Sequence, residues 1–156
     1  MKVVRHVLIS LEERHANNIL TGTKQVELRR RKMHVAPGTT VWFYVKKPLG
    51  AVVGYAFAGE TYTAAPSTVW RNYGCVSGIS KAEFTNYFGG LAVASALLLS
   101  EPRKLKQQIS LDDLRTQAPG FHPPQFYCRI EDKSPMKTLL TSAEAETDPL
   151  RNSRTT

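Results

Sequence analysis

The chain has 156 residues and a formal net charge of +8, with 21 Lys and Arg against 13 Asp and Glu. This length suits one domain with its own core, and a basic chain of this size favours polyanions, of which nucleic acid is the commonest. The first residues lack the apolar run of a signal peptide, and the longest apolar stretch, Leu91 to Leu99, is too short to span a bilayer, so we expect a cytoplasmic protein with no membrane partner.

The N-terminal segment is predicted to form a strand and a helix. HVLIS, residues 6–10, is an apolar strand, and Ser10 with Glu13 forms an S-x-x-E capping box that predicts a helix from residue 11. Gly22 supplies the stop signal of that helix.

KQVELRR, residues 24–30, alternates in polarity and is predicted to be a half-buried strand. Val26 and Leu28 fall on one side, and Glu27 and Arg29 on the other. An arginine on the same face can brace the carboxylate of Glu27 through a charge-assisted hydrogen bond.

The middle of the chain is predicted to hold two strands and then two short helices. Residues 39–47 and 51–62 are rich in β-branched and aromatic residues, and turns with proline and glycine bound them. A short helix is expected over residues 66–74, and a second capping box, Ser80 with Glu83, opens the next helix.

Residues 93–100 and 103–110 are predicted to be two strands, Ser110 caps a short helix, and residues 126–130 form a closing strand. Residues after Glu131 show no sustained periodicity, so we expect a domain over 1–131 and a disordered tail over 132–156. The element order differs from regular βα alternation and favours an α+β fold, a small mixed β-barrel with flanking helices.

One lone acid lies inside the densest basic run of the chain, TGTKQVELRRRK. Lys24, Glu27 and Arg29 at a cleft could hold a nucleotide, with the lysine on phosphate and the carboxylate on the amino or imino groups of a base. The alternative is an exposed strand with one incidental ion pair, which contributes little to stability.

The stretch ILTGTKQVELRRR resembles the signature of the ASCH family, a branch of the PUA-like superfamily. The family hallmark, G-x-K-x-x-E-x-R, is filled here by Gly22, Lys24, Glu27 and Arg29, and the resemblance covers residues 3–131. It implies a PUA-like barrel with a cleft lined by Lys24, Glu27 and Arg29. It also implies RNA binding or RNA-linked chemistry.

An enzyme is the alternative. ASCH-like amidohydrolases that act on 4-acetylcytidine use a threonine three residues after the lysine, where this chain has Glu27. A hydrolase acting on a modified nucleoside or on RNA would here combine Lys24 with a carboxylate base, Glu27 or Glu60. RNA cleavage could also draw on His34 or His122.

The expected ligand is RNA or a nucleotide, and the wider site comprises a set of basic and aromatic residues. We expect phosphate contacts from Arg30, Arg31 and Lys32, and an extended positive surface from Lys46 and Lys47. We expect Tyr87 and Phe121 to stack on bases. A non-catalytic regulatory interaction module stays a third possibility.

Several cofactor and enzyme signatures are absent from the sequence. It has no GxxxxGK[ST] or GxGxxG phosphate loop, no HExxH, no GxSxG and no paired Cys/His set. Cys75 and Cys128 are far apart and are expected to be reduced thiols. We therefore expect no cofactor and no metal site.

Overall fold

A mixed sheet with the strand order β2-β5-β4-β3-β1-β6 forms the frame of the computed structural model, which describes residues 5–148. Its strands are β1 (His6–Leu11), β2 (Val26–Arg29), β3 (Thr40–Val45), β4 (Ala51–Ala64), β5 (Ala94–Ser110) and β6 (Tyr127–Ile130). The helices are α1 (Glu13–Thr21), α2 (Pro66–Tyr73), the 3-10 helix η1 (Gly74–Val76), α3 (Lys81–Phe88), α4 (Leu111–Gln117) and α5 (Pro135–Thr147).

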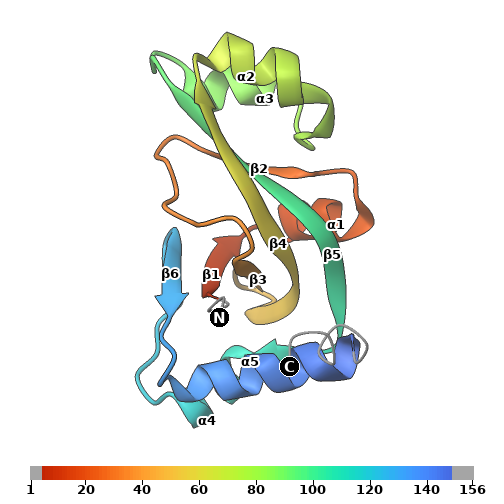
Figure 1. The fold of residues 1–156 in the computed structure, drawn as a ribbon, viewed down its shortest axis with the longest axis vertical. Helices are drawn as coiled ribbons and strands as arrows, with labels where there is room; N and C mark the ends of the chain where they lie inside the picture. Colours follow the sequence, from red (N-terminus) through yellow and green to blue (C-terminus); the bar gives the residue numbers. More distant parts are fainter. Residues whose placement is uncertain (1–4, 149–156) are drawn as a thin grey trace.

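The sheet curls into a half-barrel that lies between two groups of helices (Figure 1). β1 and β3 pair in parallel, and all other pairs are antiparallel. In Figure 1, β4 and β5 run along the length of the molecule, with α2 and α3 at one end and α4 and α5 at the other. This architecture confirms the predicted α+β barrel with flanking helices.

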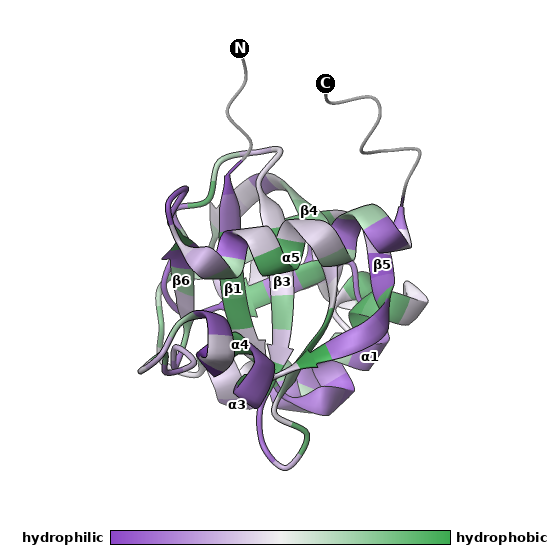
Figure 2. Ribbon diagram, turned by 90° about the horizontal axis from the view of Figure 1, so that it is seen from below, coloured by the Kyte–Doolittle hydropathy of each residue, from purple (hydrophilic) through white to green (hydrophobic). Residues whose placement is uncertain are grey.

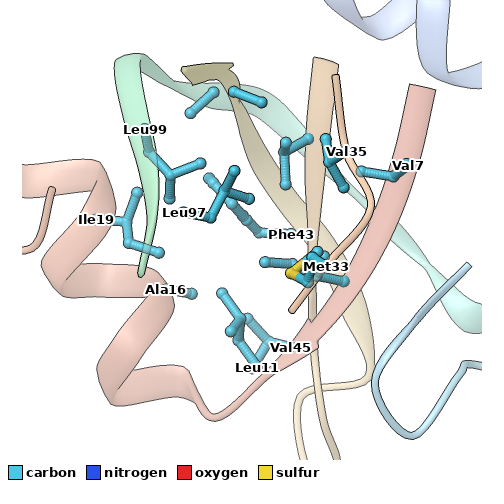
Figure 3. Close-up of a cluster of buried hydrophobic side chains, with 14 residues drawn as sticks. Val7, Leu11, Ala16, Ile19, Met33, Val35, Phe43, Val45, Leu97 and Leu99 are labelled. Atoms are coloured by element: carbon cyan, nitrogen blue, oxygen red, sulfur yellow. The ribbon is translucent and has the colours of Figure 1, made fainter. Parts of the chain in front are cut away.

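The inner face of the half-barrel holds one apolar cluster. Alternate residues of β1 and β3, among them Ile9 and Phe43, turn inward to meet Ile19 from α1 and Leu97 and Leu99 from β5. Figure 3 shows this cluster between α1 and the strands, with Ile19, Phe43, Leu97 and Leu99 labelled. This packing holds α1 against β3 and β5, and the motif residues follow from the end of α1 into β2.

The outer face of the sheet is covered by α4 and α5. Trp42 and Tyr55 from the strands pack here with Leu114 of α4 and with Met136 and Leu140 of α5. Figure 2 shows α5 lying across the strands, with hydrophobic strand segments visible behind it.

A third cluster joins the insert between β4 and β5 to β2. Val26 and Leu28 pack against Val69 of α2 and against Phe84 and Phe88 of α3. Since neighbouring residues on a strand point to opposite faces, this contact commits Glu27 and Arg29 to the other side of β2.

Most predicted elements are confirmed, but the predicted cap of the first helix is wrong. Ser10 belongs to β1, and its hydroxyl donates to the carbonyl oxygen of Pro124 at 2.5 Å. The helix begins at Glu13 without a side-chain cap, and Gly22 ends it in the left-handed region. The capping boxes of Ser80 and Ser110 are both present.

Two further expectations need correction. The two strands predicted over 93–110 are one strand, β5, in which Glu101 adopts a φ of 52°. Disorder after Glu131 is wrong for Pro135–Thr147, because α5 buries Met136 and Leu140 in the outer cluster. Residues 149–156 of the expected tail lie outside the described residues, and the domain limits stay a prediction.

Within residues 5–148, no helix combines the length and apolar character needed to cross a membrane.

Candidate functional site

A cleft of about 460 Å³ opens between α1, β2 and α3 and contains the three charged residues of the sequence motif. Lys24, Glu27 and Arg29 all line it. Its volume lies in the range of small-ligand sites. The strand parity predicted for β2 brings Glu27 and Arg29 to one face, and Lys24 joins them from the turn between α1 and β2.

Arg29 and Glu27 form an ion pair inside the cleft. Arg29 Nε lies 3.2 Å from Glu27 Oε1, and the two side chains are only 15% and 7% exposed. Arg29 Nη2 also donates to the carbonyl oxygen of Ser10 at 3.3 Å, and the guanidinium lies 4.6 Å from the centre of the Phe126 ring. These contacts hold the arginine from three sides beside the carboxylate, but its Nε makes no hydrogen bond to any residue in the described part of the chain.

The second carboxylate oxygen of Glu27 has no such partner. Oε2 is covered from solvent and makes no hydrogen bond to any residue in the described part of the chain. A covered carboxylate oxygen without a donor is costly, and such groups mark strained or ligand-binding positions. One acceptor of the ion pair is therefore unused.

Lys24 is buried at the edge of the same cleft. The left-handed turn at Gly22 ends α1, and Lys24 follows with a side chain that is 3% exposed. Its Nζ donates to the carbonyl oxygen of Ser77 at 2.6 Å. Burial lowers the pKa of Lys24 from its ordinary value, while the Glu27 carboxylate acts in the opposite direction.

His15 is a cleft residue that the sequence analysis did not select. It lies on α1, four residues before Ile19, and it lines the cleft. Burial and the nearby Lys24 lower the pKa of His15, which favours the neutral imidazole. Its Nδ1 is covered and has no hydrogen-bond partner among residues 5–148.

The remaining basic residues of the motif region lie outside or at the rim of the cleft. Arg30 donates from Nε to the carbonyl oxygen of Tyr87 at 2.7 Å, and its guanidinium lies 4.5 Å from the centre of the Tyr87 ring. Tyr87 lines the cleft, but this arginine already stacks on its ring. Arg31 and Lys32 are exposed and do not line the cleft.

Lys46 and Lys47 follow β3 on the far side of the cleft. Lys46 lines the cleft and also a second hollow, of about 550 Å³, where Lys47 and Arg115 join it. The positive surface predicted for this turn is therefore continuous with the cleft at Lys46.

Four residues named from the sequence do not reach the cleft. Glu60 lies where the pairing of β4 with β5 shifts register, and it is exposed, so it does not join Lys24. Phe121 packs against the outer cluster beneath α4. His34 lines a different hollow, beside His6, and His122 is exposed.

No group of three or more His, Cys, Asp or Glu residues in the described ranges is arranged to hold a metal ion. Cys75 and Cys128 are free thiols in this structure.

Comparisons with known proteins place this geometry in a family. No family model matches the chain. The ASCH domain-containing ribonuclease of Zymomonas mobilis is 29% identical over 142 residues, which are 91% of this chain and 95% of that protein. The crystal structure of ASCH from Zymomonas mobilis superposes with a TM-score of 0.81 at 29% identity, covering 87% of this chain and 94% of that one. A single-substitution variant of that protein gives a TM-score of 0.81 at 30% identity over 88% of this chain and 95% of that one.

More distant solved structures share the fold alone. A protein from Leishmania major matches with a TM-score of 0.59 at 11% identity, covering 92% of this chain and 97% of that one. The mixed half-barrel with its helices defines a protein of the PUA-like class. Within that class, the chain belongs to the ASCH domain family.

Proposed function

We propose that the protein binds RNA or a nucleotide in the cleft of Lys24, Glu27 and Arg29. The observation that carries the proposal is that the buried Lys24 and the carboxylate of Glu27, which is paired with Arg29, line one cleft of the size of a small-ligand site. Phosphate contacts supply position and affinity, and an acceptor such as a carboxylate supplies contacts to a base edge.

The charges that line the cleft divide into paired and unpaired groups. Glu27 neutralises Arg29, and Glu83 neutralises Arg14 at 2.7 Å. Lys24 and Lys46 form no ion pair within 4.0 Å in the part of the chain that the structure describes. These two lysines are therefore the phosphate-binding groups of the proposed site, and Arg31 and Lys32 extend the attraction outside it.

Salt dependence of binding tests this proposal. A labelled single-stranded RNA is titrated with the protein at about 50 and about 200 mM salt, and binding is followed by fluorescence anisotropy. Each lost phosphate contact reduces the slope of log K against log salt by about 0.7, so Lys46→Ala should flatten the slope. Lys106→Ala is the charge-matched control, because Lys106 is exposed on β5 and does not line the cleft. Affinity that is unchanged by salt, or equal losses in both variants, would contradict the proposal.

Cleavage of RNA is a second candidate, favoured by the name of the Zymomonas relative, a ribonuclease. In this reaction Glu27 removes the proton of a ribose 2′-hydroxyl, whose oxygen forms a bond to the adjacent phosphorus as the bond to the 5′-oxygen breaks. Lys24 stabilises the added negative charge, and the departing oxygen takes a proton from solvent.

A substrate with a single 2′-deoxy nucleotide separates cleavage from binding. We expect RNA fragments from wild-type protein and none from Glu27→Gln or from the deoxy substrate, which still binds. Release of acetate from 4-acetylcytidine, measured with the same proteins, would instead favour the amidohydrolase alternative. If Glu27→Gln cleaves RNA as fast as wild type, Glu27 is not the base.

A further inference from the structure

A second hollow adjoins the cleft and carries only positive charge. It has a volume of about 550 Å³ and is lined by Lys46, Lys47 and Arg115, with no carboxylate among the described residues that line it. The cleft, by contrast, is lined by three glutamates beside its basic residues. The hollow therefore attracts anions without the internal neutralisation found in the cleft.

The positive charges of the hollow are not neutralised by neighbouring acids. Its two lysines and its arginine form no ion pair within 4.0 Å in the part of the chain that the structure describes. The aspartates of α4, Asp112 and Asp113, do not line the hollow, and Asp113 accepts from the backbone N–H of Ser110 at 3.3 Å. An incoming phosphate therefore displaces no carboxylate of this protein.

Arg115 is already oriented for binding an anion. It is half-buried on α4, and its Nε donates to the carbonyl oxygen of Phe121 at 2.9 Å, while the Phe121 ring packs against the outer cluster. Its two terminal nitrogens donate to no residue within positions 5–148. A guanidinium held in this way presents a planar pair of donors to two phosphate oxygens and loses little conformational freedom on binding.

Ser10 of β1 joins the hollow to the cleft, because Ser10 and Lys46 line both. The hydroxyl of Ser10 donates at 2.5 Å to the carbonyl oxygen of Pro124, which lies in the wall of the hollow. The carbonyl oxygen of Ser10 accepts from Arg29 of the cleft at 3.3 Å. One strand residue thus holds part of each wall, and Lys46 lies where the two sites meet.

The position of Lys46 indicates where a bound chain continues. Lys24 and Lys46 are the phosphate-binding groups proposed above, and single-stranded nucleic acid binds along grooves in which cations follow its backbone. The volumes of the cleft and of the hollow, about 460 and 550 Å³, each lie in the range of one small-ligand site. A chain with one nucleotide in the cleft can therefore place its neighbour in the hollow.

We propose that the second hollow is a subsite for a neighbouring nucleotide of a single-stranded RNA, with Lys47 and Arg115 on its phosphate. The inference rests on the RNA-binding function proposed above and names the substrate class, an oligonucleotide rather than a single nucleotide. Arg115 is a binding residue that the sequence analysis did not select.

Ligands of two lengths test the inference. Labelled pentauridylate is titrated by fluorescence anisotropy, and its 2′-fluoro riboses lack the hydroxyl needed for cleavage. Unlabelled uridine monophosphate competes with it for the cleft. We expect wild type to bind pentauridylate about tenfold or more tightly than the mononucleotide, and Arg115→Ala to weaken pentauridylate binding about fivefold, because charge-assisted hydrogen bonds are lost. The inhibition constant of uridine monophosphate should not change in this variant, since the mononucleotide occupies the cleft alone.

Two further variants separate the loss of a contact from a loss of structure. Lys47→Ala removes an exposed side chain of the same hollow, and it should also weaken pentauridylate binding and leave the mononucleotide unaffected. Arg71→Ala is the charge-matched control for Arg115→Ala, because Arg71 is exposed on α2, at the opposite end of the molecule from α4 (Figure 1). It should leave the binding of both ligands unchanged.

The outcomes separate this inference from the proposed function. Pentauridylate affinity that is no greater than that of uridine monophosphate, or that is unchanged in both Lys47→Ala and Arg115→Ala, would overturn the subsite and leave binding in the cleft standing. Equal losses for both ligands in Arg115→Ala, with no loss in Lys47→Ala, would also overturn it. No binding of either ligand would overturn the proposed function, and this inference with it.

Discussion

His6 makes the stability of the protein sensitive to mild acid. Its side chain is buried, 6% exposed, and Trp42 Nε1 donates to its Nδ1 at 3.1 Å. Burial, helped by Lys137 and opposed by Asp132, lowers the pKa of His6 from 6.5 to about 4. A protonated Nδ1 could not accept from Trp42, so the folded state requires the neutral ring.

The sign and size of the effect follow from these two pKa values. Between pH 6.5 and about 4 the unfolded chain binds the proton and the folded chain does not, so stability falls as the pH falls through this window. The loss is about 1.2 kcal/mol at pH 5.5 and about 2.4 kcal/mol at pH 4.5, relative to pH 7.

Urea unfolding at these pH values, followed by tryptophan fluorescence, measures this loss. His6→Asn keeps an acceptor for the Trp42 N–H and does not titrate, so comparing it with wild type isolates the histidine from all carboxylates. We expect the free energy of unfolding of wild type to fall by about 2.4 kcal/mol more than that of His6→Asn between pH 7 and pH 4.5. Equal losses in the two proteins would refute the reasoning.

Three further predictions concern the fold. Arg29→Met should destabilise the protein by about 3 kcal/mol in urea unfolding, because it leaves the buried carboxylate of Glu27 without its counter-charge. Gly54→Ala should lower stability by about 2 kcal/mol, since the added Cβ would lie 2.5 Å from the backbone oxygen of Arg103, and thermal unfolding measures this. Leu140→Ala should cost about 3 kcal/mol because Leu140 of α5 is 1% exposed, and chemical unfolding measures this.

Each of these predictions has a matched control. Adding Glu27→Gln to Arg29→Met should restore part of the lost stability, since no buried charge then lacks a partner; no recovery would count against the ion-pair argument. Gly59→Ala should be tolerated better than Gly54→Ala, because its Cβ would have no neighbour nearer than Leu98 Cβ at 3.4 Å, an ordinary van der Waals distance. Thr138→Ala, at an exposed position of α5, should leave stability nearly unchanged, and a loss equal to that of Leu140→Ala would contradict the packing of α5.

The features that follow from local rules could be predicted from the sequence. Alternation along β2 predicts that Glu27 and Arg29 share a face, and the structure gives them an ion pair. The caps of Ser80 and Ser110 and the left-handed turn at Gly22 are equally local, because each depends on residues within one helical turn.

The features that depend on residues far apart in the chain could not be predicted from the sequence. Ser10 lies in a valid capping pattern, but β1 pairs through it with Tyr44 of β3, and its hydroxyl meets Pro124, far along the chain. Helical periodicity shows that His15 lies on a covered face, but it cannot distinguish a core from a cleft wall. For α5 a local signal did exist: Ser134 caps a helix that opens with Pro135, in a segment of otherwise weak periodicity.

The insert between β4 and β5 gives the site a modular construction. β4 and β5 pair up to Ala64 and Ala94, the residues that flank the insert, so the pairing of the two strands does not include the insert (Figure 1). Yet Ile79, Asn86 and Tyr87 of the insert form one wall of the cleft. Changes in these wall residues that keep the apolar contact of the insert with β2 can therefore alter which ligand the ASCH motif meets, while the sheet that holds the motif keeps its register.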